Sequence, residues 1–159
     1  MEFVRGDKIE VCIKEEGFLG SYYEATVVSQ LPKGLYVVQY KELFEESNES
    51  EPLVETVRDR EVRPVPPQIP AAEFRFLDVV DAFDNDGWWV GKISGKKSSD
   101  HYYVFFEITS DEIAYPVSRL RAHLDWVKGK WVSPKNKKAK KMERGGEGLR
   151  RIVSSDNGL

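Results

Sequence analysis

The sequence predicts an all-β protein made of two small barrels in tandem. Three observations support this prediction: a pattern of short alternating segments occurs twice, turn residues separate the segments, and a proline-rich stretch divides the two copies. Short strands with frequent turns and no helical periodicity are typical of small barrels, which also leave few exposed sheet edges. Each copy holds about 60 residues, a size at which one barrel is marginally stable alone, so we expect the two to pack side by side.

The first two predicted strands are similar in the two copies. Residues 7–13 match residues 78–84, since both are alternating runs that begin with an aspartate. Residues 20–27 match residues 85–93, because each has a turn with glycine, an aromatic pair, a small residue and then a β-branched residue. Alternating runs that follow turn residues predict half-buried strands.

The later strands repeat as well. The step along the chain from Tyr23 to Tyr40 equals the step from Trp89 to Phe106, so no gap is needed between the second and third strands. We infer that the chain arose by duplication of one unit. The third and last strands are predicted at residues 36–40 and 61–64 in the first copy, and at residues 102–106 and 119–122 in the second.

A proline-rich connector divides the two copies. Four prolines within residues 63–70 cannot continue a sheet, and they predict a stiff, extended segment. The predicted domains are a first barrel over residues 1–66, the connector over residues 67–72, a second barrel over residues 73–133 and a basic, disordered tail over residues 134–159.

Two segments depart from the repeat. Residues 41–51 are polar and acidic, and they are predicted to form a loop after the third strand. In residues 124–132, aromatic residues alternate with basic ones. This second pattern fits either a closing strand or a short helical cap, with its tryptophans covering a seam between the barrels.

The chain carries an acidic folded region followed by a basic end. Residues 135–159 hold eight Lys or Arg against three Asp or Glu, so their formal charge is +5, which leaves −8 for residues 1–134. An acidic surface attracts basic peptides and repels nucleic-acid phosphates. We therefore expect a basic peptide as the partner and no direct nucleic-acid binding outside the tail. No stretch is apolar enough to cross a bilayer, so no membrane partner is expected. The single Cys12 fits a reducing compartment.

Both copies resemble plant Agenet domains. The resemblance covers about residues 3–132 and holds in order and spacing. It implies two five-stranded, Tudor-like barrels of the Royal family. It also implies a nuclear chromatin reader whose partner is a methylated lysine of a histone tail, with dimethylated lysine 9 of histone H3 as the expected mark. The segments that carry the resemblance are residues 11–12, 17–28, 36–40 and 62–67 in the first copy, and residues 80–83 and 87–93 in the second.

A methylated lysine requires a receptor of aromatic faces and carboxylates. The methylated ammonium keeps its positive charge, loses N–H donors and gains apolar surface, so it is attracted to the negative faces of aromatic rings. A nearby carboxylate accepts the N–H that a mono- or dimethylated ammonium retains and that a trimethylated one lacks. Such an aromatic cage therefore needs two to four rings and at least one acidic residue at one end of a barrel.

The first copy is predicted to hold this aromatic cage. Period-two alternation places Tyr23 at the barrel mouth, and the resemblance implies cage positions at Tyr23 and Tyr40. Aromatic residues in the first loop and in the acidic segment are expected to complete the cage, and two glutamates to select lower methylation states. The alternative is that Tyr23 and Tyr40 belong to the barrel core. The predicted peptide-binding residues are Phe18, Tyr22, Tyr23, Tyr40, Phe44, Glu45 and Glu46.

The second copy is expected to shape an acidic groove between the barrels. It has Trp89 and Phe106 at positions that match the predicted cage, with Tyr115 and Asp86 nearby. Its first loop is shorter than that of the first copy, and residues 110–116 are less acidic than the matching segment. The predicted supporting residues of the groove are Trp88, Trp89 and Phe106.

The sequence indicates a binding module rather than an enzyme. His101 and His123 are the only histidines, and together with one cysteine they complete no zinc set. Residues 91–97 resemble a phosphate-binding loop, but they have one residue too few between the glycines, and Lys97 stands where Ser or Thr should bind magnesium. We therefore expect no enzymatic activity, no cofactor and no metal.

Two other binding functions stay open at this point. Small barrels with exposed aromatic residues beside Lys or Arg can stack unpaired bases, and a groove can act as a scaffold that recognises an unmodified protein motif. A reader binds methylated and unmethylated peptides with different affinities, whereas the other two functions do not depend on methylation. The basic residues 135–141 fit either a nuclear localisation signal or a solvated linker.

Overall fold

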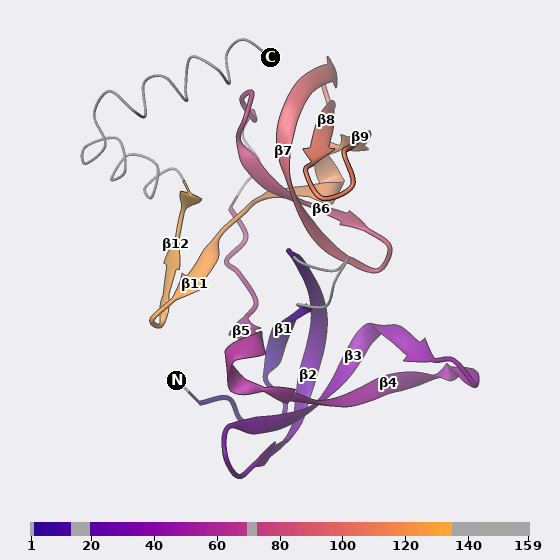
Figure 1. The fold of residues 1–159 in the computed structure, drawn as a ribbon, viewed down its shortest axis with the longest axis vertical. Helices are drawn as coiled ribbons and strands as arrows, with labels where there is room; N and C mark the ends of the chain where they lie inside the picture. Colours follow the sequence, from indigo (N-terminus) through magenta and orange to yellow (C-terminus); the bar gives the residue numbers. More distant parts are fainter. Residues whose placement is uncertain (1, 14–19, 70–72, 135–159) are drawn as a thin grey trace. The chain divides into compact units, whose positions relative to one another are not determined.

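The computed structural model describes residues 2–13, 20–69 and 73–134, which form twelve strands and two 3-10 turns (Figure 1). The all-β fold predicted from the sequence is confirmed. Phe18 and the basic tail from residue 135 onwards lie outside the described residues. The first barrel contains β1 (Lys8–Ile13), β2 (Ser21–Leu31), β3 (Leu35–Glu45), β4 (Asn48–Arg58), η1 (Asp59–Glu61) and β5 (Val62–Pro64). The second contains β6 (Val79–Asp84), β7 (Gly87–Ser98), β8 (His101–Phe106), β9 (Asp111–Pro116), η2 (Val117–Arg119) and β10 (Leu120–Ala122), and β11 (Asp125–Val127) and β12 (Lys130–Val132) follow.

The two barrels share one strand register, as expected of a duplicated unit. In the first barrel Val11 of β1 lies opposite Tyr23 of β2, and in the second Ala82 of β6 lies opposite Trp89 of β7. The short last strand pairs with the first strand in both barrels. The paired residues of these strands therefore have counterparts in the other barrel, and these positions can be compared one by one.

Each barrel has a hydrophobic core of its own. Strand alternation directs every second side chain inward, and the inward residues are largely aliphatic, with one matching tyrosine near the centre of each core, Tyr36 and Tyr102. The hydroxyl of each of these tyrosines accepts a hydrogen bond from a backbone N–H that precedes the first strand, that of Phe3 at 3.2 Å and that of Phe74 at 3.3 Å. The buried cores are Phe3, Ile9, Val11, Tyr23, Ala25, Val27, Tyr36, Val38, Tyr40, Val57 and Val62, and Val80, Ala82, Ile93, Tyr102, Val104, Tyr115 and Leu120.

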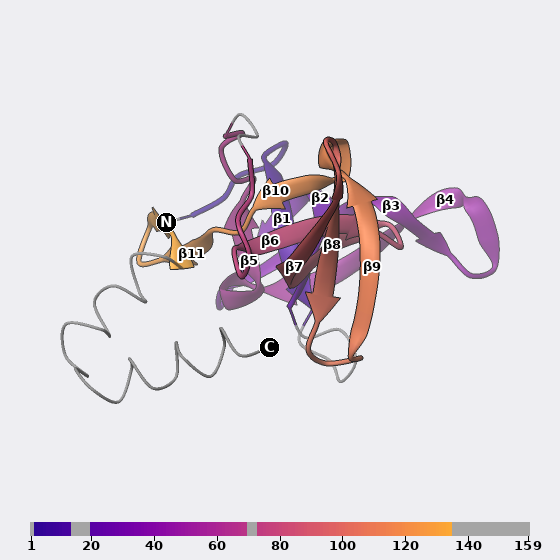
Figure 2. The ribbon, with the colours of Figure 1, turned by 90° about the horizontal axis from the view of Figure 1, so that it is seen from above.

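The predicted loop over residues 41–51 is wrong. Strand β3 continues to Glu45 and β4 begins at Asn48, so the acidic segment is the end of a two-stranded ribbon (Figures 1 and 2). The register shifts twice along this ribbon, on either side of Phe44. Leu43 and Leu53 pack against the core of the first barrel, but most side chains of this ribbon are polar, so the sequence pattern alone did not reveal its strands.

Strands β2 and β7 connect the two barrels within one unit of the chain, residues 1–122. Ser21 and Tyr22 lie opposite Trp89 and Trp88 in an antiparallel pair. Packing at this junction is close, because a Cβ atom placed on Gly87 would lie 2.7 Å from the ring of Tyr23. Glycine at position 87 therefore lets the tyrosine ring lie directly against the backbone of β7.

A buried network of charges spans the same junction. The carboxylate of Glu10, which is fully buried, accepts hydrogen bonds from Arg63 Nη2 at 2.8 Å and from Arg121 Nη1 at 2.8 Å. Arg121 Nε also donates to Asp81 Oδ2 at 2.8 Å, and Asp81 is fully buried as well. Glu10 and Asp81 are counterparts in the duplicated register, as are Arg63 and Arg121. Buried charges tolerate desolvation only when paired in this way.

The residues after Ala122 form a separate unit. There β11 and β12 make a hairpin in which Trp126 lies opposite Trp131, with ring centroids 4.9 Å apart. Lys128 and Gly129 have φ values of 50° and 76° at its turn, the left-handed conformation that tight hairpins require. The sequence left open a closing strand or a helical cap. The described residues form strands rather than a helix, but β11 and β12 pair with each other in a separate two-stranded sheet. None of the described residues forms a helix of the length and hydrophobicity needed to span a membrane.

Candidate functional site

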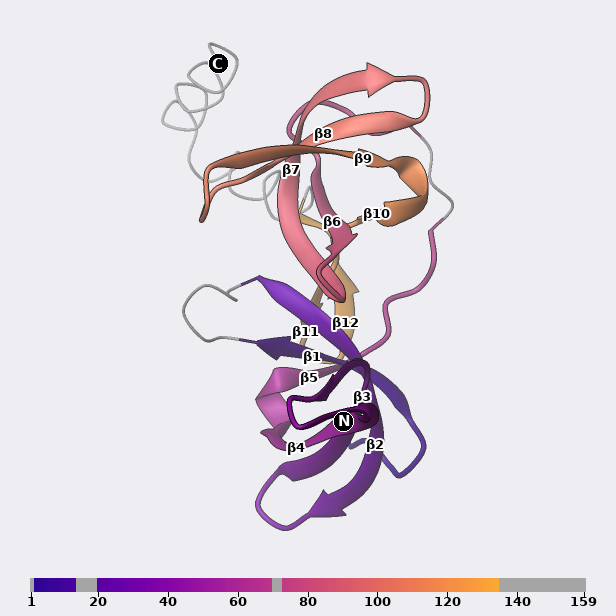
Figure 3. The same ribbon diagram turned by 90° about the vertical axis from the view of Figure 1, so that its right-hand side faces the viewer.

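A pocket of about 550 Å³ is present in the second barrel and involves β6, β7, β8 and β9. Figure 3 shows β7, β8 and β9 as neighbouring strands of this barrel. The volume is within the range of sites that hold small ligands or single side chains. The residues that give the pocket its chemistry are three aromatic residues and two carboxylates: Trp89, Phe106, Tyr115, Asp84 and Asp111.

Strand alternation brings the three rings to the pocket. Trp89 points to the same face of β7 as the buried Ile93, and Phe106 points to the same face of β8 as the buried Val104. Tyr115 of β9 is 5% exposed and meets Phe106 edge to face, with ring centroids 6.2 Å apart and an interplanar angle of 86°. Trp89 and Phe106 are half-buried, so parts of both rings face the pocket.

Asp84 is held at the pocket by the hairpin between β6 and β7. Asn85 and Asp86 at its turn have φ values of 47° and 66°, as a two-residue hairpin turn demands. The carboxylate of Asp84 accepts hydrogen bonds from Tyr115 Oη at 2.7 Å and from the Asn85 backbone N–H at 2.9 Å. The indole N–H of Trp89 donates to the Asp84 carbonyl oxygen at 2.6 Å. Side chain and backbone of one residue thus orient two of the three rings.

The hydroxyl of Tyr115 keeps its proton to more alkaline pH than an ordinary tyrosine does. Burial raises its pKa above the ordinary value of 10.0, and the hydrogen bond to Asp84 and the charge of Asp84 raise it further. The phenol therefore stays protonated at neutral pH, while Asp84 keeps acceptor sites on its carboxylate.

Gly91 allows side chains of β8 to pack closely against β7 at the pocket. A Cβ atom at this position would lie 2.5 Å from Val104 Cγ1 and 3.1 Å from Phe106 Cδ1. A side chain on Gly91 would overlap Val104 and crowd Phe106, so the glycine lets both side chains pack against β7.

The first barrel differs at the matching positions. In the shared register, Trp89 and Phe106 correspond to Tyr23 and Tyr40, while Tyr115 corresponds to Val57 and Asp84 to Ile13. The first barrel thus has an aliphatic residue where the second has its third ring, and another where the second has its carboxylate. These first-barrel side chains pack in or against the hydrophobic core.

Tyr23 and Tyr40, the two central residues of the predicted cage, are buried. They are 4% and 2% exposed, respectively. The ring of Tyr23 meets Trp89 edge to face at 6.5 Å, and the hydroxyl of Tyr40 donates to Glu55 Oε1 at 3.3 Å. Burial raises the pKa of Tyr40, and the Glu55 carboxylate raises it further. Both rings thus belong to the barrel core, which was the alternative interpretation of the sequence.

Tyr22 and Trp88 stack against arginines. The guanidinium carbon of Arg63 lies 3.6 Å from the centre of the Tyr22 ring, and that of Arg121 lies 4.1 Å from the centre of the Trp88 ring. Both arginines also donate hydrogen bonds to Glu10, so the two rings pack against the charge network. Neither Tyr22 nor Trp88 lines the pocket of the second barrel.

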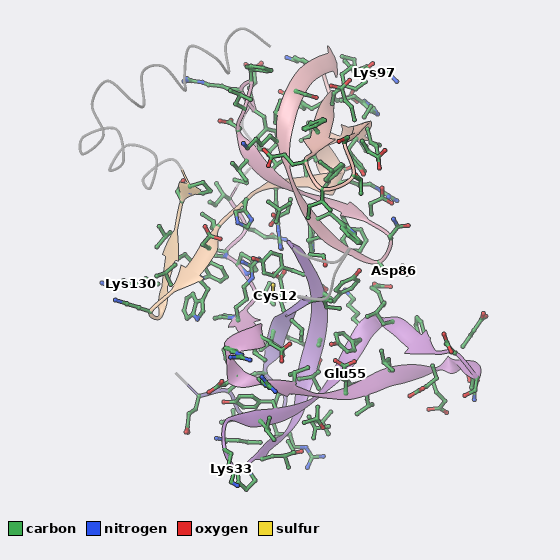
Figure 4. All side chains as sticks on the ribbon, viewed as in Figure 1. Cys12, Lys33, Glu55, Asp86, Lys97 and Lys130 are labelled. Atoms are coloured by element: carbon green, nitrogen blue, oxygen red, sulfur yellow. The ribbon has the colours of Figure 1, made fainter. Side chains whose placement is uncertain are left out.

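The other predicted residues meet at the tip of the β3–β4 ribbon. Phe44, Glu45 and Glu46 line an acidic hollow there together with Asp86, which Figure 4 labels on the β6–β7 hairpin. Phe44 is 46% exposed. Tyr23 and Tyr40 do not line this hollow, so the structure brings together one half of the predicted cage without the other half.

Sequence reasoning missed Asp84 and gave Tyr115 only a neighbouring role. The signal for Asp84 was its position directly before the Asn85–Asp86 turn, which fixes it at the end of β6. The signal for Tyr115 was its register opposite Tyr102 of the core, which requires knowledge of the β8–β9 pairing. Within residues 2–13, 20–69 and 73–134, no group of three His, Cys, Asp or Glu side chains is arranged to hold a metal ion.

The chain is similar to plant proteins, some of which are named for their Agenet domains. The family model described as Agenet domain matches residues 6–67. The chain is 34% identical over 132 residues to the Arabidopsis thaliana protein AGENET DOMAIN (AGD)-CONTAINING P1, covering 83% of this chain and 25% of that protein. It is 33% identical over 148 residues to DUF724 domain-containing protein 3 of the same plant, covering 89% of this chain and 21% of that protein. The chain thus spans a quarter or less of the length of these two relatives.

Two solved structures share the fold over most of both chains. The crystal structure of Arabidopsis thaliana AGDP1 AGD34 has a TM-score of 0.80 and 34% identity, covering 83% of this chain and 90% of that chain. The crystal structure of ADCP1 tandem Agenet domain 3-4 has a TM-score of 0.75 and 31% identity, covering 83% of this chain and 88% of that chain. By sequence and by fold, the chain therefore belongs to the Agenet domain family.

Proposed function

We propose that this chain is a chromatin-associated reader that binds a methylated lysine of a histone tail in the pocket of the second barrel. The observation that carries the proposal is the meeting of Trp89, Phe106 and Tyr115 around the carboxylate of Asp84. Similarity to the tandem Agenet domains of AGDP1 and ADCP1 supports a role in binding rather than catalysis.

The chemistry of the pocket suits a methylated ammonium. Each desolvated ring face contributes roughly 0.5–2 kcal/mol to binding a cation. Asp84 supplies an acceptor for an N–H, and Asp111 adds negative charge at the pocket. An acceptor of this kind favours mono- and dimethylated lysine over trimethylated lysine, which has no N–H to donate.

We propose the second barrel as the binding site because the first lacks matching groups. A cage needs rings whose faces are open to the ligand, and Val57 and Ile13 supply neither a ring nor a carboxylate. The cage predicted for the first barrel from the sequence stays a prediction, since it includes Phe18. The acidic hollow at the β3–β4 tip is proposed to attract the basic residues that flank the lysine.

The proposed partner is the histone H3 tail, with dimethylated lysine 9 as the first mark to test. This choice rests on the resemblance to plant tandem Agenet readers, and a nuclear location follows from the same proposal. The formal charge of −8 over residues 1–134 complements a basic tail.

Calorimetric titration of the 159-residue chain with H3 N-terminal peptides tests this function. The peptides are unmodified or mono-, di- or trimethylated at lysine 9, and the mono- and dimethylated forms should bind most tightly. Asp84→Asn keeps the shape of the side chain but removes its charge, so it should reduce the preference for dimethylated over trimethylated peptide. Equal binding of all forms, methylated or not, would contradict a reader and favour a scaffold.

A further inference from the structure

Two exposed isoleucines stand at the mouth of the second-barrel pocket. Ile108, in the turn between β8 and β9, is 61% exposed, and Ile113 of β9 is 39% exposed. Both line the same pocket as Trp89 and Phe106. Single exposed apolar residues need no explanation, but two at one pocket mouth extend the apolar surface of the rings to the outside.

The local structure would accept a polar residue at both isoleucine positions. The turn over residues 107–110 places Ile108 where polar turn residues are usual. Ile113 lies opposite Val104, and its counterpart in the first barrel is Glu55, which lies opposite Val38. The second barrel thus has an exposed aliphatic side chain where the first has a carboxylate.

The pocket lining also carries charge, from the carboxylates of Asp84, Glu107 and Asp111 and from the ammonium of Lys92. Asp111 and Glu107 line the pocket, and the ammonium of Lys92 lies 3.0 Å from Glu107 Oε1. The mouth therefore has an aliphatic part and a negatively charged part. A basic peptide that also presents an aliphatic side chain matches both.

We propose that Ile108 and Ile113 bind an aliphatic side chain of the same peptide, two residues from the methylated lysine. This inference rests on the proposed function and adds the sequence context that the pocket reads. In an extended peptide, side chains two positions apart point to the same side. A residue at position −2 or +2 relative to the lysine therefore faces the protein when the lysine enters the pocket.

The test is a titration of the full chain with synthetic peptides that carry one central dimethylated lysine. In an otherwise constant sequence, alanine is replaced by valine or leucine at −2, −1, +1 or +2, and each peptide also exists in an unmethylated form. We expect the larger side chain at −2 or +2 to lower Kd about three- to tenfold, as burial of one or two methylene groups would. The same change at −1 or +1 should leave Kd unchanged.

Variants assign the effect to the two isoleucines. Ile108→Ser or Ile113→Ser should abolish the gain, and the exposed Ile69, which does not line the pocket, provides Ile69→Ser as a matched control that keeps it. A Kd that is the same for alanine, valine and leucine at all four positions would overturn the proposal. So would a gain that persists in both variants at the mouth. If the methylated and unmethylated peptides bind equally, the proposed function fails, and this inference fails with it.

Discussion

The hydroxyl of Tyr115 donates a 2.7 Å hydrogen bond to Oδ2 of Asp84, and this bond joins β9 to β6 at the pocket. It occupies one oxygen of the carboxylate and fixes the edge of the Tyr115 ring against Phe106. The first barrel has Val57 and Ile13 at the two matching positions and cannot form such a bond. The bond therefore marks a difference between the two barrels: the second has an aromatic pocket that holds a carboxylate, and the first has aliphatic side chains at the two matching positions.

Tyr115→Phe is expected to lower the free energy of unfolding by about 1–2 kcal/mol, because the variant loses a charge-assisted hydrogen bond that is largely buried. Urea denaturation measures the change. Tyr103→Phe is the matched control, since the Tyr103 hydroxyl makes no hydrogen bond to the described residues of the chain, and it should change stability by less than about 0.5 kcal/mol. Equal effects of the two variants would contradict the importance of the Tyr115–Asp84 bond.

Alkaline pH should destabilise the protein through Tyr40 and Tyr115. Burial, together with the nearby Glu55 and Asp84, raises the pKa of each phenol above its ordinary value of 10.0. The unfolded chain then releases protons that the folded chain retains, so stability is full below pH 10 and falls as the pH rises above that value. The expected slope is about 1.4 kcal/mol per pH unit for each group.

Urea denaturation at a series of pH values measures this slope, and tyrosinate absorbance reports the ionisation. The double variant Tyr40→Phe, Tyr115→Phe should lose most of the dependence. Stability that stays constant between about pH 9 and 11 would show that the two phenols are not held protonated by the fold.

Glu10→Gln should destabilise the protein by about 3–5 kcal/mol, because it leaves the buried Arg63 without its carboxylate and the part-buried Arg121 with Asp81 as its remaining acidic partner. Thermal and urea unfolding both measure this loss. The exposed pair Lys41–Glu24, with an N–O distance of 3.3 Å, provides the control: Lys41→Gln should cost less than about 1 kcal/mol. A loss in Glu10→Gln no larger than in Lys41→Gln would mean that the network does not hold the barrels together.

Gly87→Ala should destabilise the junction between the barrels by about 1–3 kcal/mol, since the new methyl group overlaps the Tyr23 ring. Gly95→Ala, on the same strand, is the matched control. Its Cβ would lie 3.6 Å from Tyr103 Cδ2, an ordinary contact, so it should be neutral. Denaturation curves of the two variants that coincide would contradict the close packing at position 87.

The fold was predictable because the chain repeats itself. The equal spacing of Tyr23 and Tyr40 and of Trp89 and Phe106 aligned two strands of each barrel, and the observed registers agree with that alignment. The β3–β4 ribbon was not predictable from periodicity, because residues 44–51 are mostly polar and do not alternate between apolar and polar side chains.

The details of the site depended on contacts that sequence spacing does not encode. Alternation identified the face of Tyr23 but not its burial, which follows from the approach of Gly87. Likewise, the stacking of Arg63 on Tyr22 depends on the charge network with Glu10. Asp84 lies 31 residues from Tyr115 in sequence, and only the closed barrel brings the two together.

The most direct test of the proposed binding site compares Phe106→Leu with Phe44→Leu in titrations with an H3 peptide dimethylated at lysine 9. Both changes keep an apolar side chain and remove a ring, one in the second-barrel pocket and one at the tip of the first-barrel ribbon. We predict that Phe106→Leu weakens binding about tenfold, with circular dichroism unchanged, while Phe44→Leu binds like the original chain. Loss of binding in Phe44→Leu and none in Phe106→Leu would contradict it and place the methyl-lysine site in the first barrel.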